Sequence, residues 1–243
     1  MRVLVISDIH ANYTALQAVL KDAGQVDETW CLGDLVGYGP DPNAVVEEVR
    51  EIPNLTCMLG NHDVAVIGKM PFETFNGDAR RSLMHHEKVM TADNMDYLNS
   101  LSSNTKVCGD ATLAHGSPRD PLWEYILNSL SARINFDHFT TPWCFVGHSH
   151  IQCLFALDPR SDRVTLDQTK PDKTINLRPK LILNPGSVGQ PRDRDPRAAY
   201  AIYDTDANTW TPRRVMYNIA EVQERIRSSG LPEKHAARLA EGW

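Results

Sequence analysis

Short apolar segments alternate with helical patterns over the first 60 residues of the chain. Residues 2–7 form an apolar, largely β-branched run that ends in a polar turn, and apolar positions at helical spacing begin at Leu16. The same order repeats, with strands expected over 29–32 and 55–59 and a helix expected over 43–50. Strands that alternate with helices predict right-handed crossovers and a mainly parallel inner sheet.

The pattern changes after this first part. Apolar positions at about 72–101 keep helical spacing, which predicts an excursion of two helices. The second half favours strands, expected over 106–108, 111–114, 144–146, 152–157, 180–183, 199–203 and 210–215. Charges and prolines over 158–179 predict an exposed hairpin or loop. A C-terminal helical tail is expected at about 219–240, broken at Gly230 and Pro232.

Composition agrees with one packed domain over residues 1–243, of which 42% are apolar and 23% are charged. The longest apolar run, residues 198–203, is far shorter than the roughly 20 residues that a membrane-spanning helix needs. The apolar start is also too short for a signal peptide, and the five cysteines form no C-x-x-C pair. We therefore expect no membrane association and a cytoplasmic location.

The charge of the chain limits its partners. Lysine and arginine number 25 against 31 aspartates and glutamates, which gives a net charge of −6. An extended surface for nucleic acid would carry the opposite sign, so we expect no extended nucleic-acid binding. A phosphorylated ligand would instead be held locally, by a metal or by a few arginines.

Side chains that can bind metals gather where predicted strands end. Five of the nine histidines follow such strands, together with aspartates and an asparagine: Asp8, His10, Asp34, Asn61, His62, Asp63, His115, His148 and His150. The carboxyl ends of strands in an open α/β sheet share one edge, where groups distant in sequence converge on one crevice. The sequence thus predicts a single site built from well-separated segments.

This residue set predicts a pair of transition metals. Oxygen and nitrogen ligands without thiolate suit manganese, iron, zinc, cobalt or nickel better than calcium or magnesium. There are too many ligands for one ion, and in D-x-H or H-x-H on an extended segment both side chains lie on one face. Asp34 has two oxygens with which to bridge two ions. We expect two divalent ions, with manganese the first choice.

Five motifs resemble those of the calcineurin-like metallophosphoesterases, in that family's order and over most of the chain. They are Asp8-Ile9-His10, Gly33-Asp34, Gly60-Asn61-His62-Asp63, His115-Gly116 and Gly147-His148-Ser149-His150. The resemblance implies an α/β fold, a four-layer α/β/β/α sandwich of two mixed sheets with the site at one edge. It also implies that Asp8, His10, Asp34 and His150 hold one metal, and that Asp34, Asn61, His115 and His148 hold the other.

The same resemblance implies a reaction. In two-metal phosphoester hydrolysis, a hydroxide held between the ions attacks phosphorus in line with the leaving group. The family gives His62 the task of protonating the leaving oxygen, which suits an imidazole of pKa near 6.5. Asp63 is expected to orient His62, and Asn61 and His62 are expected to contact substrate.

Differences from the family's motifs narrow the range of expected substrates. Members that act on phosphoproteins carry G-D-x-V-D-R-G, whereas residues 33–39 here read Gly-Asp-Leu-Val-Gly-Tyr-Gly. This argues against a protein phosphatase and favours the branch of bacterial small phosphodiesterases and diadenosine polyphosphatases. Arg192 and Arg194, with Arg197, are candidates to replace the missing phosphate clamp. They alternate with aspartates, so a solvated charge cluster remains the alternative reading.

Three functions are therefore compared. The first is a metal-dependent phosphoesterase that hydrolyses a small phosphodiester or nucleotide-like substrate. The second is a dinucleoside polyphosphate hydrolase of the diadenosine tetraphosphate type. The third is a non-catalytic, metal-binding scaffold for protein partners, and the complete ligand set argues against it. A homo-oligomer is compatible with all three.

Other prominent residues have structural explanations. Asn12 is expected to cap the first helix, and this is favoured over a contact with substrate. Residues 184–187 form either a phosphate-binding backbone nest or a glycine turn. Four histidines are expected on the surface: His85, His86, His138 and His235. Four aromatic residues are expected in the core: Trp30, Trp143, Tyr200 and Tyr203.

Overall fold

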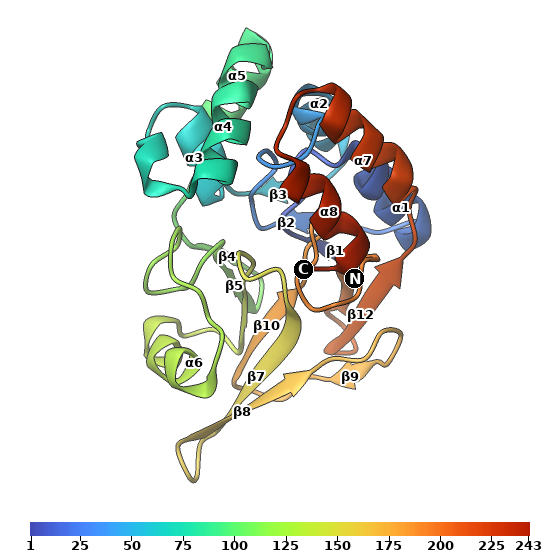
Figure 1. Ribbon diagram of the computed structural model, residues 1–243. Coiled ribbons are helices and arrows are strands. Elements are labelled where there is room, and N and C mark those ends of the chain that lie inside the picture. The colour runs from blue at the N-terminus through green and yellow to red at the C-terminus, as the bar shows by residue number, and fades with distance from the viewer.

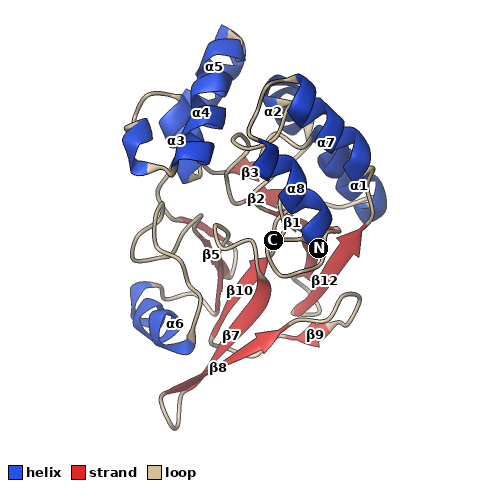
Figure 2. Cartoon of the chain, in the orientation of Figure 1, coloured by secondary structure: helices blue, strands red, loops and turns tan.

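Two six-stranded sheets face each other in the computed structural model, which describes residues 1–243 (Figures 1 and 2). The strands of the first sheet are, in spatial order, β3 (Leu55–Cys57), β2 (Glu28–Cys31), β1 (Arg2–Ile6), β11 (Ala198–Asp204), β12 (Thr209–Val215) and β9 (Ile175–Asn176). Strands β1, β2 and β3 are parallel, whereas β11, β12 and β9 add antiparallel pairs. The expected parallel inner strands are therefore present within a mixed sheet.

The second sheet is also mixed. Its strands are, in spatial order, β4 (Lys106–Cys108), β5 (Ala111–Leu113), β6 (Trp143–Phe145), β10 (Leu181–Pro185), β7 (Gln152–Asp158) and β8 (Arg163–Gln168). Strands β5, β6 and β10 run parallel at its centre. Strand β8 pairs with β7 as a hairpin at the edge, so the region expected as an exposed hairpin or loop extends the sheet.

Helices cover the outer faces of both sheets. On the first sheet lie α1 (Tyr13–Ala23), α2 (Pro42–Glu51), α7 (Ile219–Ser228) and α8 (Glu233–Glu241). Beside them stand α3 (Asn61–Val66), the short turn η1 (Phe72–Thr74), α4 (Gly77–Val89) and α5 (Ala92–Ser100). The second sheet is covered by α6 (Ser129–Asn135) and the turn η2 (Phe136–His138). No helix has the length and apolar character required to cross a bilayer.

Side-chain alternation along the strands builds three apolar layers. Leu4 and Ile6 of β1 point toward the helices, whereas Val3 and Val5 point toward the other sheet. In the second sheet, Phe145 packs between the sheets, and the residues beside it face α6. Three buried layers between four structural layers confirm the expected α/β/β/α sandwich.

Polar side chains start most of the helices. The side-chain oxygen of the residue before the helix accepts N–H groups of the first turn in five cases: Asn12, Asn76, Thr91, Asn128 and Asn218. Asn12 therefore caps α1 as expected. The same signal at Asn128 begins α6, which apolar spacing did not predict because this helix has only seven residues.

The aromatic residues expected in the core are buried there, since Trp30, Trp143, Tyr200 and Tyr203 are at most 4% exposed. Two of the four histidines expected on the surface are buried instead. His86 is 0% and His235 is 1% exposed. The reason is tertiary packing, because the polar faces of α4 and α8 on which they lie are covered by the loop that contains Tyr38.

Candidate metal centre

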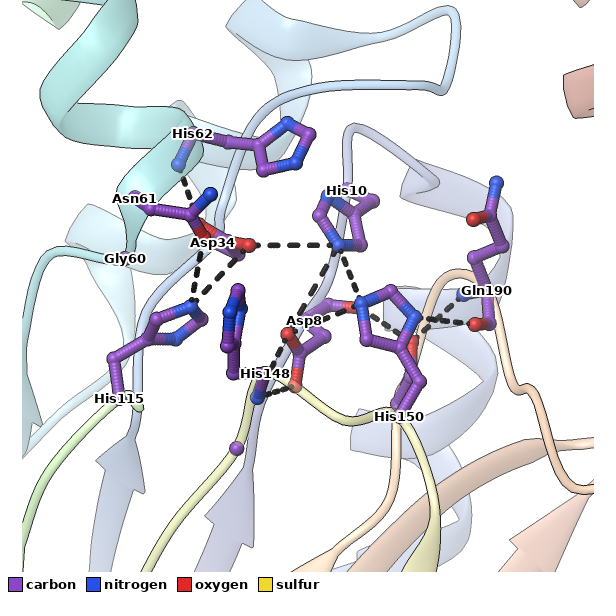
Figure 3. Close-up of polar contacts among 12 residues, drawn as sticks. Asp8, His10, Asp34, Gly60, Asn61, His62, His115, His148, His150 and Gln190 are labelled. Atoms are coloured by element: carbon purple, nitrogen blue, oxygen red, sulfur yellow. Dashed lines mark hydrogen bonds and ion pairs between the residues drawn. The ribbon is translucent and has the colours of Figure 1, made fainter. Parts of the chain in front are cut away.

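The ligand candidates lie at the ends of parallel strands in both sheets. Asp8, Asp34 and Asn61 follow β1, β2 and β3 of the first sheet, and His115 and His148 follow β5 and β6 of the second. Figure 3 shows these side chains pointing toward one another. None of the predicted ligands is more than 3% exposed. The two sheets thus bring the predicted ligand set together in one buried cluster.

The backbone of the cluster is bent at the ligands themselves. Five of them have a positive φ, between 49° and 62°: Asp8, His10, Asp34, His148 and His150. This left-handed conformation is uncommon for residues other than glycine and persists where the surrounding structure enforces it, often at functional sites. The bends direct successive side chains into the cluster at the ends of the strands.

Asp8, His10 and His150 form one candidate ligand group. The His150 Nε2 atom lies 3.3 Å from Asp8 Oδ1, and His10 Nε2 lies 3.9 Å from the same oxygen. The two Nε2 atoms are 3.0 Å apart. Three potential ligand atoms from two sheets therefore surround one point.

Asp34, His115 and His148 form a second group. The Asp34 Oδ2 atom lies 3.4 Å from His115 Nε2, and Asn61 Oδ1 lies 3.2 Å from the same nitrogen. Asp34 Oδ2 is also 3.6 Å from His10 Nε2 of the first group. Asp34 thus lies between the two groups, where a bridging carboxylate would be needed.

Backbone carbonyls orient three of the imidazoles. The Nδ1 atoms of His10, His115 and His150 lie 3.0, 3.0 and 2.6 Å from carbonyl oxygens of Val36, Leu32 and Gln190 respectively. A metal-binding histidine typically donates its other ring N–H in this way, which fixes the tautomer and the ring orientation. In a neutral ring, this contact leaves the lone pair on Nε2, the atom that faces the cluster.

The electrostatics of the cluster call for a cation. Burial lowers the pKa of His10 to about 3, so its ring is neutral. Its Nε2 then faces that of His150 lone pair to lone pair, and neither has a proton to donate. Asp34 Oδ2 and His148 Nε2 are buried without any hydrogen-bond partner. Such groups are costly to bury unless a positive charge compensates them, and a metal ion would do so.

The charge balance at Asp34 supports this interpretation. Burial opposes its ionisation, but His115, His62 and His10 hold the pKa of Asp34 well below its usual range. Burial also opposes protonation of His115, yet Asp34 raises the pKa of His115 to about 9. A proton on His115 thus balances the buried carboxylate. A divalent cation would take over this role, so the donor set fits transition metals.

His62 lies beside the cluster and Asp63 faces away from it. The His62 ring is 4.8 Å from that of His10 and 4.5 Å from that of Tyr38, and its Nδ1 is buried without a partner. Asp63 was expected to orient this ring. Its oxygens instead accept the backbone N–H groups of Val36 and Gly60, at 3.1 and 2.9 Å. Asp63 therefore holds the two loops that carry Asp34 and Asn61.

The three arginines considered for phosphate binding differ in position. Arg192 stacks over Tyr38, with its Cζ atom 5.6 Å from the ring centroid, beside the cluster. The exposed Arg194 lies over the ring of Trp243 at the C-terminus. Arg197 pairs with Asp195 at 2.6 Å. Only Arg192 is brought to the candidate site.

Tyr125 was not predicted from the sequence as part of the site, and the turn over 184–187 was predicted only as a phosphate nest or a glycine turn. Tyr125 stacks on His148 with ring centroids 3.8 Å apart, although it follows no strand. In the turn over 184–187, Asn184 donates to the Gly147 carbonyl at 2.7 Å, and Ser187 donates to the Asp8 carbonyl at the same distance. The turn thus holds the backbone of two ligand loops. In the sequence, the asparagine and the serine of this turn were the residues that could have indicated such side-chain hydrogen bonds.

The chain is similar in sequence to known proteins. An uncharacterized protein of Methanocaldococcus jannaschii is 35% identical over 248 residues, which cover 98% of this chain and 96% of that protein. A symmetrical bis(5′-nucleosyl)-tetraphosphatase of Photorhabdus laumondii is 39% identical over 72 residues, 28% of this chain and 26% of the relative.

Structural and family comparisons also cover most or all of the chain. The crystal structure of a metallophosphoesterase from Sphaerobacter thermophilus superimposes with a TM-score of 0.91 and 47% identity, and covers 100% of this chain and 99% of that chain. Residues 1–208 match the model of the calcineurin-like phosphoesterase superfamily domain. This chain therefore belongs to the calcineurin-like phosphoesterase superfamily.

Proposed function

We propose that this protein is a cytoplasmic, binuclear-metal phosphoesterase that hydrolyses a small phosphodiester or nucleotide-like substrate. The observation that carries the proposal is the position of Asp34, whose Oδ2 lies 3.4 Å from His115 Nε2 of one ligand group and 3.6 Å from His10 Nε2 of the other. A carboxylate in this place is suited to join two cations. Membership of a phosphoesterase superfamily gives the reaction class.

The residues divide between two ions. Asp8, His10 and His150 would hold one ion, and His115, His148 and Asn61 the other, with Asp34 shared. Two divalent transition ions, manganese first among them, would supply Lewis-acid polarisation of a phosphoryl group and a nucleophile derived from water at neutral pH. The carbonyls of Val36, Leu32 and Gln190 keep three imidazoles in the tautomer that binding requires.

His62 supplies the proton for the leaving oxygen in this proposal. Its backbone N–H donates to Asp34 Oδ1 at 2.9 Å, which places its side chain next to the shared carboxylate. Its Nδ1 is buried without a partner beside Gly37. Burial lowers the pKa of the ring, so His62 would take up its proton only beside a bound anionic substrate. A positioned imidazole typically contributes about 10²- to 10⁴-fold to a rate through proton transfer. Asn61 would contact substrate from the same helix start.

Arg192 provides the phosphate contact that the G-D-x-V-D-R-G arginine supplies elsewhere in the family. Its backbone N–H donates to the His150 carbonyl at 3.1 Å, so a ligand segment and this arginine are held together. The neighbouring Arg194 faces Trp243 and has no such place. A planar guanidinium suits a phosphoryl oxygen pair.

A dinucleoside polyphosphate hydrolase is the second candidate. The similarity to the symmetrical bis(5′-nucleosyl)-tetraphosphatase of Photorhabdus laumondii favours it, although that similarity spans 28% of this chain. The same residues would act on an anhydride in place of an ester. A non-catalytic scaffold would have no need for the complete, oriented ligand set.

Hydrolysis of three substrates tests the proposal. Bis-p-nitrophenyl phosphate, p-nitrophenyl phosphate and diadenosine tetraphosphate are each assayed with and without added Mn²⁺. We expect metal-dependent turnover, highest on a diester or on the tetraphosphate. Absence of metal-dependent turnover on all three would contradict the enzyme and favour the scaffold.

His62→Ala tests the proton donor. We expect the variant to keep its metal content and to lose about 100-fold in kcat, most strongly for esters with poor leaving groups. His85→Ala, on the half-buried neighbour of His86, is the matched control and should keep its rate. An equal loss for leaving groups of very different pKa would contradict the role of His62.

A further inference from the structure

Two arginines near the metal centre lack an acidic partner. Five arginines have a buried Nε without a well-aligned hydrogen bond: Arg133, Arg192, Arg213, Arg225 and Arg238. In three of these, a carboxylate oxygen lies 2.8 or 2.9 Å from the guanidinium group. Arg192 and Arg238 have no such neighbour and form no ion pair. Burying a cation without compensation is costly, so these two have the character of an anion site.

Arg192 lies at the edge of the metal centre. Its guanidinium stacks over Tyr38, whose ring is 4.5 Å from each of the rings of His10 and His62. Its only side-chain hydrogen bond runs from Nη2 to Gln190 Oε1, at 3.1 Å. Its Nε is buried without an acceptor, and most of its five donors are unused within the protein.

Arg238 approaches the same place from the C-terminal helix α8. His235, three residues earlier, packs its ring 4.9 Å from that of Tyr38, and residues three apart share a helix face. Burial and the nearby charge of Arg192 lower the pKa of Arg238, so the two cations repel each other. His235 Nδ1 is also buried without a partner. Asp78, the carboxylate that acts on Arg238, is paired with Arg81 instead.

A small cavity links α8 with the metal centre. It has a volume of about 10 Å³ and is lined on its polar side by His10, Asn12, Tyr38, Gln190 and His235. A space of this size accommodates about one water molecule. The side chains of α8 and a candidate metal ligand therefore share one enclosure.

We propose that Arg192 and Arg238 form a second phosphoryl-binding subsite, so that the preferred substrate carries an oligophosphate chain. One phosphoryl group would lie at the metal centre, and the next would lie between the two guanidinium groups. An anion there removes their mutual repulsion and gains charge-assisted hydrogen bonds, which are the strong class. This inference rests on the proposed function and specifies its substrate class.

Competition between anions of different length tests the subsite. Tripolyphosphate and orthophosphate are compared as inhibitors of bis-p-nitrophenyl phosphate hydrolysis at fixed free Mn²⁺, with wild type, Arg238→Gln, Arg238→Lys and Lys234→Gln. The last variant removes an exposed charge from the same helix. We expect Arg238→Gln to raise the inhibition constant of tripolyphosphate about tenfold and that of orthophosphate less than about threefold. Arg238→Lys should restore part of the loss.

Calorimetry of the full chain after removal of metal gives a second readout. Tripolyphosphate should bind the wild type and Lys234→Gln alike, and Arg238→Gln about tenfold more weakly. Equal effects of Arg238→Gln on the two anions, or equal effects of Arg238→Gln and Lys234→Gln, would overturn the subsite. If the protein hydrolyses no ester, the proposed function fails, but the calorimetric comparison still decides the subsite.

Discussion

Gly37 lies where the imidazole of His62 needs room. A Cβ atom at this position would be 2.2 Å from His62 Nδ1, well inside van der Waals contact. Gly37 also has φ +93°, a conformation that residues with a side chain rarely adopt. The glycine therefore permits both a sharp turn after Asp34 and the placement of the proposed proton donor.

Gly37→Ala should reproduce the loss of His62. We expect kcat to fall by about 100-fold with metal content unchanged, because the added methyl group displaces the imidazole. Gly68→Ala is the control, since Gly68 has φ +73° but open space around its Cβ position. It imposes backbone strain alone. Equal rate losses in the two variants, with His62 unmoved in a crystal structure of Gly37→Ala, would refute the steric explanation.

The sequence predicted the metal-ligand candidates better than it predicted the residues that surround them. Asp8, Asp34 and His115 follow apolar strands, and the carboxyl ends of parallel strands meet at one edge, so their convergence was predictable. The contact of Tyr125 with His148 was not, because a loop residue has no periodicity that predicts its neighbours. Burial of His86 likewise depends on which loop covers α4, and the local sequence does not predict such tertiary packing.

At the scale of elements, helix α4 supports the loop that carries Gly37. His86 accepts the Gly37 N–H at Nδ1, at 3.0 Å, and its Nε2 lies 2.9 Å from the Gly39 carbonyl oxygen. Ser82 Oγ accepts the Tyr38 N–H at 3.2 Å. This arrangement needs a neutral imidazole with its proton on Nε2. The helical excursion therefore stabilises the loop beside the metal centre.

His86 should make the fold sensitive to acid. Burial lowers the pKa of His86 to about 3, below the ordinary 6.5. The unfolded chain therefore binds this proton more readily than the folded protein does. The contribution of neutral His86 to the free energy of unfolding is thus complete above pH 6.5 and declines as pH falls toward 3. His86→Gln keeps a donor and an acceptor but does not titrate.

Urea unfolding of chelator-treated protein between pH 7 and pH 4.5 measures this effect. The free energy of unfolding of the wild type should fall by about 2 kcal/mol more than that of His86→Gln over this range, since one pKa unit corresponds to about 1.4 kcal/mol. Parallel declines in the two proteins would show that His86 does not remain neutral in the fold.

The elements themselves were predicted unevenly. Strands β1, β2 and β11 were expected within one or two residues of their bounds, because apolar runs of this length indicate buried strands. Helix α6 was missed because seven residues are too few for apolar spacing to reveal; its two large apolar residues, Leu130 and Ile134, are exposed in the fold. The two-sheet arrangement came from the family resemblance rather than from periodicity.

At the scale of the whole molecule, the metal centre depends on the contact between two sheets. Asp8 and Asp34 belong to the first sheet, and His115 and His148 to the second (Figure 3). Phe145 fills the core between the sheets, with ring centroids 4.8 Å from Trp210 and 5.3 Å from Tyr203. The position of one sheet against the other therefore sets the spacing of the ligands.

Phe145→Ala should weaken stability and metal binding together. We expect a loss of about 3–5 kcal/mol in unfolding free energy, as for other buried phenylalanines, and a weaker affinity for Mn²⁺. Phe155→Ala is the control, because Phe155 is similarly buried but lies in the outer layer with α6. It should lose similar stability and keep its metal affinity. Unchanged Mn²⁺ affinity in a folded Phe145→Ala protein would contradict this dependence.

Metal stoichiometry tests the central claim most directly. Full-length wild type and Asp34→Asn are equilibrated with Mn²⁺, separated from free metal and analysed for protein and metal content. Asp34→Asn keeps the shape of the side chain but removes the shared negative charge. We predict two ions per wild-type chain and one or none in Asp34→Asn. A wild type that binds fewer than two ions at saturation, or an Asp34→Asn protein that retains two ions and full activity, would contradict a binuclear centre bridged by Asp34.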